Sequence, residues 1–434
     1  MATGVRGKER LSDHAPTVAS DDLAGGELPP KGMQAHLVYP GKQSEREILS
    51  SQPGRYFSIT RNADRAPAIP GPNAFLLSDN QSAIAALIET GLRADLVYLD
   101  PPYGTGSGFQ SRALTHAYED DRDGARYLES LRRRLVLLRD CMADDASIYV
   151  HIGHQMVGHL KVLLDEIFGP QNFRNIIARR KCSSKNSTRK SYANLHDFLL
   201  FYSRSKTYKW NQPGEEPSEE WIDKEYPWRD SKGRYKLVPI HAPGTRNGST
   251  GTAWRGMLPP PGKHWQFTPV RLEELDKRGE MHWSKNGNPR RKVYLTKDKM
   301  IALTDHWQNF RDAHHQSVEI TGYPTEKNVF MLQKIVEASS CENDVVVDPY
   351  CGSGTTLEAA SLAGRRWLGI DQSFIAAEAT LRRLRYGGAP MGDYVGLRRQ
   401  AGRTKSVGPV DFAFLAHAEA LALEPRAVAK LART

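Results

Sequence analysis

The sequence of 434 residues is poor in cysteine, with only Cys141, Cys182, Cys341 and Cys351 scattered along it. No two of them form a C-x-x-C pair, which argues against a zinc site or a disulfide framework and predicts a reducing compartment. The chain also lacks any apolar run close to the roughly 18 residues that a membrane span needs, and it starts without the apolar core of a signal peptide. We therefore expect a cytoplasmic protein with no membrane partner.

Positive charge is what the composition has in excess. The chain carries 60 Lys and Arg against 50 Asp and Glu, a formal net charge of +10, and its pI is near 9.3. This charge favours a polyanionic partner, because attraction to phosphates supplies most non-specific affinity for nucleic acids. Many basic proteins share such a balance, so the charge alone leaves a nucleic-acid partner and an ordinary basic surface equally open.

The stretch DLVYLDPPYGTG, residues 95–106, combines the features of a strand end and of a binding site. Its apolar first half ends in Asp100, and buried parallel strands end in this way at the edge where ligands bind in open α/β sheets. Pro101 and Pro102 lack N–H groups and stiffen the backbone. We expect a rigid turn that presents a carboxylate, a free carbonyl and the ring of Tyr103 together.

Strand and helix patterns alternate along much of the chain. This alternation predicts an α/β fold with a doubly wound, mostly parallel, Rossmann-like sheet. The predicted strands cover residues 74–79, 95–100, 147–153, 173–180, 196–203, 345–348 and 365–370, and the predicted helices cover 82–90, 127–142, 159–169, 320–340 and a segment from 355 onward.

A second motif, VVVDPYCGSGTT, begins with three valines that predict a buried strand closed by Asp348. Gly352 and Gly354 allow a tight turn into a helix that begins near Thr355, where free N–H groups favour a negatively charged group. The next strand ends in Asp371, which is placed to accept hydrogen bonds from a ribose diol, as in nucleotide-binding sheets. No G-K-[ST] follows the glycines, so the motif is not a P-loop.

Composition divides the chain into four parts. Residues 1–72 are rich in Pro, Gly and charge, which predicts a flexible or loosely docked arm without a packed core. The α/β pattern occupies residues 73–206 and 300–388, whereas residues 207–299 are loop-rich, hold six of the eight tryptophans and look like an inserted domain. For any single one of these tryptophans we favour core packing over contact with nucleic acid. Residues 389–434 form a tail, in which the Ala- and Leu-rich stretch 412–431 is a predicted helix.

A basic segment, RRKCSSKNSTRK, connects two of the predicted strands and contains six Lys or Arg and no acid. We expect it to lie on a nucleic-acid backbone, and an ordinary solvated loop is the alternative. The residues concerned are Arg179, Arg180, Lys181, Lys185, Arg189 and Lys190.

Together the motifs resemble the beta-class DNA amino-methyltransferases that use S-adenosylmethionine, in which D-P-P-Y comes first, then the target-recognition domain, then F-x-G-x-G. The stretches YLDPPYGTGSGF, SIYVHIG, EIFGPQNF, YPTEKN and DPYCGSGTT with RRWLGID are most similar to Mod subunits of type III restriction-modification systems and to their solitary relatives. Tyr350 stands where the family usually has Phe and should still pack beside the cofactor. The resemblance covers about residues 75–203 and 320–384 and leaves the recognition sequence open.

The resemblance implies a permuted methyltransferase sheet with residues 207–299 as the target-recognition domain. Asp100 and the carbonyl of Pro101 would accept hydrogen bonds from the N6 amino group of a flipped adenine, and Tyr103 would stack on that base. The cofactor S-adenosylmethionine would contact Asp348, Tyr350, Gly352, Gly354 and Thr355 at its methionine end, Asp371 at its ribose, Asp79 at its adenine ring and Lys327 at its carboxylate. Double-stranded DNA is the expected partner, which would put the protein on the nucleoid.

Several alternatives stay open. Serine in place of the DPPY aspartate more often accompanies N4 of cytosine, so we favour adenine over cytosine N4. Cytosine C5 chemistry needs a cysteine, usually after proline, and no Pro-Cys pair occurs. His151, His154 and His159 are expected at strand-end and helix-surface positions, not at a metal. The alternative function is a catalytically silent DNA-binding module. The alternative partners besides DNA are a second copy of the chain, in a homodimer, and a separate restriction subunit.

Overall fold

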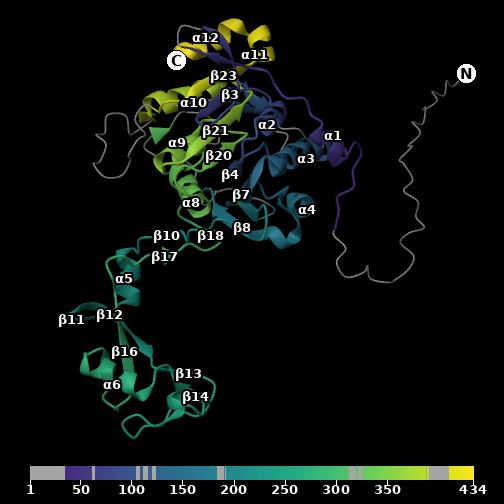
Figure 1. Cartoon of the computed structure of the whole chain (residues 1–434). Coiled ribbons are helices and arrows are strands. Elements are labelled where there is room, and N and C mark those ends of the chain that lie inside the picture. Colours follow the sequence, from purple (N-terminus) through teal and green to yellow (C-terminus); the bar gives the residue numbers. More distant parts are fainter. Residues whose placement is uncertain are drawn as a thin grey trace, which may run out of the picture.

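The computed structural model describes residues 35–60, 64–103, 108–110, 116–119, 124–182, 190, 192–311, 319–320, 326–387, 389–390 and 410–434. Its main body is built on an 11-stranded sheet, and a smaller distal lobe hangs below it (Figure 1). In spatial order the strands of the large sheet are β18 (His306–Trp307), β8 (Phe173–Arg180), β9 (His196–Ser203), β7 (Met142–Ile152), β4 (Ala94–Leu99), β20 (Val345–Asp348), β21 (Arg366–Asp371), β3 (Ala74–Leu77), β23 (Ala413–His417), β1 (Tyr56–Ile59) and β2 (Arg65–Ala68).

The centre of this sheet is parallel, from β7 through β4, β20, β21 and β3 to β23. Antiparallel pairs occur further out, where β9 lies between β7 and β8 and where β1 joins β23 and β2. The predicted doubly wound, mostly parallel Rossmann-like sheet is confirmed.

Helices cover both faces of the sheet. Alternate side chains of β4 point to opposite faces, so Val97 and Leu99 pack in one hydrophobic cluster and Leu96 and Tyr98 in the other. The first face carries α1 (Glu45–Leu49), α2 (Asn80–Glu89), α3 (Gly124–Cys141) and α4 (Val157–Phe168), and the second carries α8 (Val329–Ser339), α9 (Thr355–Leu362), α10 (Phe374–Tyr386), α11 (Ala418–Leu423) and α12 (Pro425–Arg433). Among the described residues, no helix is long and apolar enough to cross a membrane.

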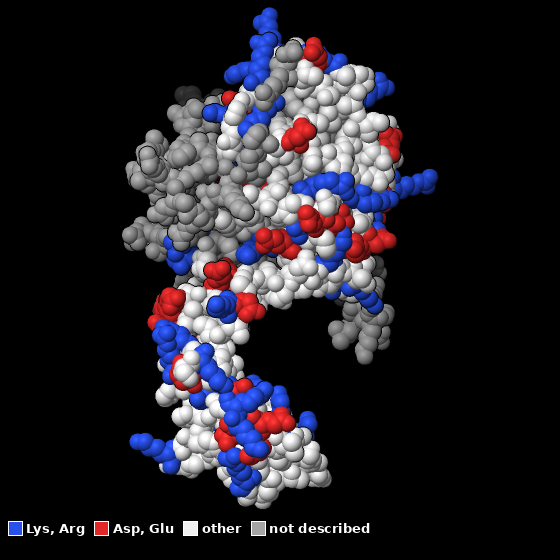
Figure 2. All heavy atoms as spheres, turned by 60° about the vertical axis from the view of Figure 1, so that its left-hand side comes forward, with Lys and Arg blue, Asp and Glu red and all other residues white. Residues whose placement is uncertain are grey.

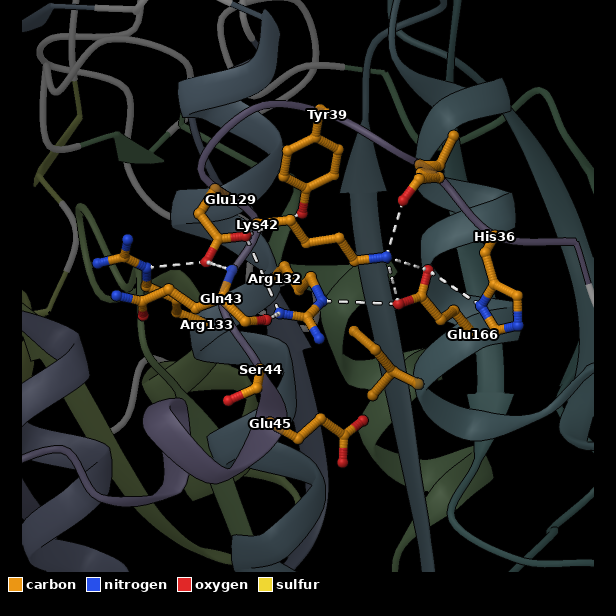
Figure 3. A network of polar contacts seen from close by, with 12 residues as sticks. His36, Tyr39, Lys42, Gln43, Ser44, Glu45, Glu129, Arg132, Arg133 and Glu166 are labelled. Carbon is orange, nitrogen blue, oxygen red and sulfur yellow. Dashed lines mark hydrogen bonds and ion pairs between the residues drawn. The ribbon is translucent and has the colours of Figure 1, made fainter. Parts of the chain in front are cut away.

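The prediction of an N-terminal arm without a packed core is wrong for residues 35–60. Ile48 of α1 and Tyr56 of β1 are buried, and β1 extends the large sheet. Polar contacts hold the chain before α1 against α3 and α4 (Figure 3): Tyr39 donates to Glu129 at 2.9 Å and Lys42 lies 2.7 Å from Glu166. The sequence hides this arrangement, because its partners lie about 90 to 124 residues away.

The C-terminal tail also joins the body. Residues 413–417, predicted as part of a helix, form strand β23 instead, and the helices α11 and α12 follow. Phe414 and Leu415 of this strand are buried because β23 lies between β3 and β1. An apolar run that is rich in Ala and Leu favours helix by itself, but an open sheet edge supplies strand partners that outweigh this preference.

The distal lobe, residues 216–300, is connected to the body by the paired strands β10 (Gly214–Glu215) and β17 (Ile301–Ala302). It has its own hydrophobic cluster, in which Trp254 and Trp265 are each only 3% exposed. Its elements are α5 (Glu219–Glu225), β11 (Trp228–Asp230), β12 (Gly233–Pro239), β13 (His241–Pro243), the short 3-10 helix Ser249–Gly251, β14 (Lys263–Trp265), α6 (Pro269–Lys277), β15 (Met281–Trp283) and β16 (Pro289–Tyr294).

Three smaller features lie outside the distal lobe. They are the 3-10 helix Pro170–Asn172, the antiparallel pair of β5 (Gly108–Gln110) with β6 (His116–Glu119), and the antiparallel pair of β19 (Glu319–Ile320) with β22 (Ala389–Pro390).

Candidate active site

Four carboxylates follow or end four adjacent parallel strands at one edge of the sheet. Asp100 follows β4, Asp348 ends β20, Asp371 ends β21, and Asp79 comes two residues after β3. The register pairs Val347 with Val97, so the DPPY turn and the glycine turn leave neighbouring strands. The two motifs therefore share one edge of the sheet. We refer to residues 100–103 with β4, β7, β9 and β8 as the DPPY half, and to residues 348–355 with β20 and β21 as the glycine-turn half.

In the DPPY half, Asp100 is held by two neighbours. The hydroxyl of Tyr103 donates a hydrogen bond to its Oδ1 at 3.1 Å, and Nζ of Lys327 lies 3.0 Å from its Oδ2. Lys327 also donates to the Tyr103 hydroxyl at 3.2 Å. Burial, and next the Asp100 charge, raises the pKa of Tyr103 well above its ordinary value, so that its hydroxyl keeps its proton and remains a donor.

The ring of Tyr103 rests against the end of β7. A Cβ added at Gly153 would lie 3.0 Å from Cδ2 of Tyr103, so glycine is what allows the ring to sit this close. The ring of His151, also on β7, is centred 6.2 Å from the Tyr103 ring. The DPPY turn is thus supported by a strand that sequence analysis did not connect with it.

Behind Asp100 lies a chain of buried polar groups. Nδ1 of His151 is 2.8 Å from the hydroxyl of Tyr98 and 4.0 Å from Oδ1 of Asp100. On its other side, Nε2 of His151 lies 3.0 Å from Asp197, to which Arg179 donates two hydrogen bonds of 2.8 and 2.6 Å. Tyr98 and Asp197 carry no signal of this contact in the sequence, because each stands in an apolar strand pattern.

The expected contact of Arg179 with nucleic acid is wrong. This residue is fully buried, since strand register places it directly opposite Asp197. Arg180 and Lys181 are partly exposed at the end of β8 and Lys190 is exposed, which leaves them available for phosphate contact. Lys185 and Arg189 lie outside the described residues.

The glycine-turn half is shaped by left-handed backbone. Gly352 and Gly354 have φ of 53° and 76°, and a Cβ at Gly354 would come within 3.0 Å of Thr380. Thr380 itself donates to the carbonyl of Gly352 at 2.9 Å, so α10 holds the turn from behind. Helix α9 then begins at Thr355 without a side-chain cap, which leaves backbone N–H groups at its start for a ligand.

Asp348 and Asp371 are held by backbone N–H groups. Tyr350 donates its N–H to Asp348 at 3.0 Å, and Gly352 and Ser373 donate theirs to Asp371 at 3.0 and 2.8 Å. Burial raises the pKa of Asp348 to about 7 and that of Asp371 to about 6. Asp348 is 2% exposed and Asp371 is partly exposed, and neither takes part in an ion pair among the described residues, so backbone N–H groups rather than cations offset their charge.

Two residues that sequence analysis did not select brace this half. Asn80 donates from its side chain to the carbonyl of Pro349 at 2.9 Å, and it is in turn held by Arg134 of α3. Arg134 also lies 2.9 Å from Asp79. Asp79 caps α2 by accepting from two backbone N–H groups, so it already has a structural task, and its contact with a cofactor stays a prediction.

The other histidines are placed differently from His151. His154 and His159 are exposed, and His159 lies on the surface of α4. His151 is buried within β7. Within the described residues, no three His, Cys, Asp or Glu side chains gather as metal ligands would.

Comparisons with known proteins place these motifs in a wider group. A family model described as DNA methylase matches residues 94–380. The chain is 55% identical over 395 residues to the Type II methyltransferase M.EcaI of Enterobacter cloacae, an alignment that covers 91% of this chain and 87% of that protein. It is 26% identical to the Type III restriction-modification enzyme StyLTI Mod subunit of Salmonella typhimurium, over 66% of this chain and 49% of that subunit, so it spans about half of that relative. The solved M1.HpyAVI–SAM complex aligns with 72% of this chain and 98% of its own, with 14% identity and a TM-score of 0.39.

Proposed function

This chain belongs to the DNA methylase family, and we propose that it moves a methyl group from S-adenosylmethionine to the exocyclic N6 amino group of an adenine flipped out of duplex DNA. The observation that carries the proposal is the shared edge of β4 and β20. Direct transfer requires donor and acceptor to be held together in line, and adjacent parallel strands bring a carboxylate, a carbonyl and a ring beside a glycine turn.

The charge of the glycine-turn half supports this cofactor. Asp348 and Asp371 have raised pKa values, so a ligand that brings positive charge would stabilise their ionised forms. S-adenosylmethionine carries a sulfonium and an ammonium group, and when bound it supplies an activated methyl group. We assign Asp348, Tyr350, Gly352, Gly354 and Thr355 to its methionine end and Asp371 to the ribose hydroxyls.

The DPPY half suits a neutral amine. An exocyclic amino nitrogen is a poor nucleophile because its lone pair is delocalised into the ring, so hydrogen bonds must hold the group while the methyl arrives. Asp100 and the carbonyl of Pro101 are two acceptors for its two protons. Tyr103 offers a face to the extruded base, and such stacking is worth roughly 1–3 kcal/mol, comparable with the few kcal/mol that flipping costs.

The position of Lys327 revises its expected role. Its Nζ lies on Asp100 and Tyr103, whereas the expectation from sequence was the cofactor carboxylate. We therefore assign it to the methyl-accepting site, where its charge keeps the Asp100 carboxylate in place. Glu326, the residue before it, is buried in an ion pair with Arg383, which anchors the segment.

We assign target recognition to the distal lobe. Figure 2 shows Lys and Arg side chains along this lobe and a hollow between it and the main body. Trp228 of β11 is 48% exposed and Arg290 of β16 is exposed, so both are available to DNA, whereas Trp254 and Trp265 serve the core of the lobe. We propose that duplex DNA binds between the lobe and the main body, with the flipped base at the DPPY turn.

The choice of adenine rests on the aspartate before Pro-Pro-Tyr. N4 of cytosine is the second candidate, because it is also an exocyclic amine that two acceptors could hold. The experiment is to incubate the purified chain with labelled S-adenosylmethionine and DNA and then to analyse the nucleosides. We expect label in N6-methyladenine. Label in N4-methylcytosine would reverse the choice of base, and cofactor binding without transfer would favour a silent DNA-binding module.

Mapping of modified bases in a host that expresses the gene would identify both the base and the recognition sequence. A second copy of the chain and a separate restriction subunit are candidate partners. Light scattering after size-exclusion chromatography tests the first, and co-purification from the native host tests the second.

A further inference from the structure

The buried polar chain behind Asp100 extends across four adjacent strands. Arg179 on β8, Asp197 on β9, His151 on β7 and Tyr98 on β4 are each at most 1% exposed. Burying polar groups in the middle of a sheet costs free energy unless each is paired. The side-chain contacts of the series lead from Arg179 to the carboxylate that we assign to the target amine.

The charge of Asp197 decides the state of His151. Burial alone would raise the pKa of Asp197, but His151 and Arg179 beside it lower that pKa well below its usual range, so Asp197 is an anion. Nε2 of His151 lies 3.0 Å from this anion, although its N–H direction is not well aligned for a hydrogen bond. A lone pair at Nε2 would be repelled by the carboxylate, so the proton of the neutral ring belongs on Nε2.

This tautomer leaves a lone pair on Nδ1, on the side of Asp100. Tyr98 is 2.8 Å away, and its hydroxyl can only donate to that lone pair. The single proton of Tyr98 is thereby used by His151 and is not offered to Asp100. The nearer oxygen of Asp100, Oδ1, lies 4.0 Å from Nδ1; it already accepts from Tyr103 and keeps its second lone pair for a further donor.

We propose that Arg179, Asp197, His151 and Tyr98 form a positioning network for the methyl-accepting site, which keeps a neutral His151 with its lone pair toward Asp100 so that Asp100 stays an acceptor for the target amine. This inference rests on the proposed function. Protonation of His151 would turn Nδ1 into a donor, which would break the bond from Tyr98 and compete with the amine for Asp100.

The groups around His151 come from every packed element. Asp100, Tyr98 and Tyr103 face it from β4 and the turn that follows, Asp197 and Arg179 from β9 and β8, and Lys327 from the segment before α8. Burial, the largest effect, lowers the pKa of His151, and Lys327 lowers it further against the opposing carboxylates. The ring is therefore neutral at pH 7.5 and gains a proton only in acid.

Two substitutions test the two ring nitrogens of His151 separately. In His151→Asn the amide overlays Nδ1 and can accept from Tyr98 but cannot titrate, whereas in His151→Gln it overlays Nε2 and leaves the Asp100 side empty. With the full chain, saturating S-adenosylmethionine and substrate DNA, we expect kcat to fall less than about tenfold for Asn and about 100-fold for Gln. The acid limb of the wild-type pH profile, which is the decrease of kcat at low pH, should disappear in the Asn variant. His159→Asn, on the surface of α4, is the matched control and should behave as wild type.

Equal kcat in the two variants, or an unchanged acid limb in His151→Asn, would overturn the network. Should both variants fold poorly, Tyr98→Phe serves instead, since it removes only a hydroxyl. It should lower kcat several-fold and raise the pH of the acid limb, and a wild-type profile would contradict the proposal.

A readout independent of activity separates this inference from the proposed function. In protein labelled with ¹⁵N-histidine, the imidazole nitrogens of His151 should report the Nε2–H tautomer at pH 7.5, and Asp197→Asn should change that pattern. A Nδ1–H tautomer or an imidazolium at pH 7.5 would refute the network even if the enzyme methylates DNA. An enzyme with the expected tautomer but no transfer would count against the proposed function alone.

Discussion

The two halves of the strand edge handle buried charge in opposite ways. In the DPPY half each acid has a cation, since Asp100 lies beside Lys327 and Asp197 beside Arg179. In the glycine-turn half Asp348 and Asp371 have backbone N–H groups, and their pKa values rise to about 7 and 6. One edge of a single sheet thus holds a site whose carboxylates are paired with cations next to a site whose carboxylates are not.

The difference teaches which ligand each half accepts. A site whose charges are already balanced gains nothing from a further cation, and it suits a neutral group that only needs acceptors. A site with unpaired buried carboxylates is stabilised by a positively charged ligand. The comparison predicts that substitutions in one half affect chemistry, whereas substitutions in the other affect cofactor affinity.

The largest effect is expected at Asp100. Replacing it with Ala removes the acceptor that we propose for the target amine, so methyl transfer should fall by more than about 10³-fold, beyond the loss typical of one hydrogen-bonding group. Because the glycine-turn half is untouched, the Kd for S-adenosylmethionine measured by calorimetry should change less than about threefold, in line with independent sites. A parallel loss of cofactor binding would erase the distinction between the halves.

Asp371→Asn should produce the converse result. The neutral amide would lose one charge-assisted hydrogen bond to the ribose that we assign to it, worth about 1.5–3 kcal/mol, so cofactor Kd should rise roughly 10- to 150-fold. At saturating cofactor, kcat should stay within a few-fold of wild type. Low kcat with unchanged Kd would assign Asp371 to the chemistry and contradict the comparison.

Lys327→Met tests which half this residue serves. The side chain keeps most of its length but loses the ion pair with Asp100, so we expect kcat to fall about tenfold with little change in cofactor Kd. Steady-state kinetics with both substrates varied separates the two parameters. A rise in Kd alone would return Lys327 to the cofactor carboxylate, as the family resemblance implied.

The smallest effect is the pH dependence that Asp371 contributes to cofactor binding in the glycine-turn half. Its two carboxyls have raised pKa values, so they bind protons as pH falls from 7.5 to 5.5, and the ionised forms that favour a cationic ligand disappear. Titration of Asp371 alone, with a pKa of about 6, should weaken cofactor binding roughly fourfold over this range. Asp371→Asn should lose that part of the dependence, and a pH-independent Kd in the wild type would contradict the raised pKa values.

The same pKa values determine the direction in which the stability of the fold changes with pH. A carboxyl whose pKa is raised by folding contributes stability below its unfolded pKa, near 3.8, and that stability is lost as pH rises through the folded value. The ligand-free protein should therefore lose stability between about pH 4 and 7 from Asp348 and Asp371. Asp197, whose pKa is lowered, acts in the other direction and only in strong acid. Thermal unfolding of Asp348→Asn and wild type at pH 5 and pH 8 would separate these effects.

Much of the edge was determined by the sequence alone. An apolar run that stops at an acid, two prolines or a pair of glycines predicts both a strand and its end, because buried parallel strands and left-handed turns permit few residue types. Asp100, Tyr103, Asp348 and the turn at Gly352 follow from such local rules.

Only the tertiary structure decided the partners. Arg179 reads as one more residue of a basic segment, yet strand register places it opposite Asp197 and buries it. His151 and Lys327, which approach Asp100, lie 51 and 227 positions away from it in sequence. Strand β23 pairs with β3, and β1 in turn pairs with β23. Pairing of this kind depends on which strands become neighbours, and that is settled by long-range burial and not by the local preferences that a sequence displays.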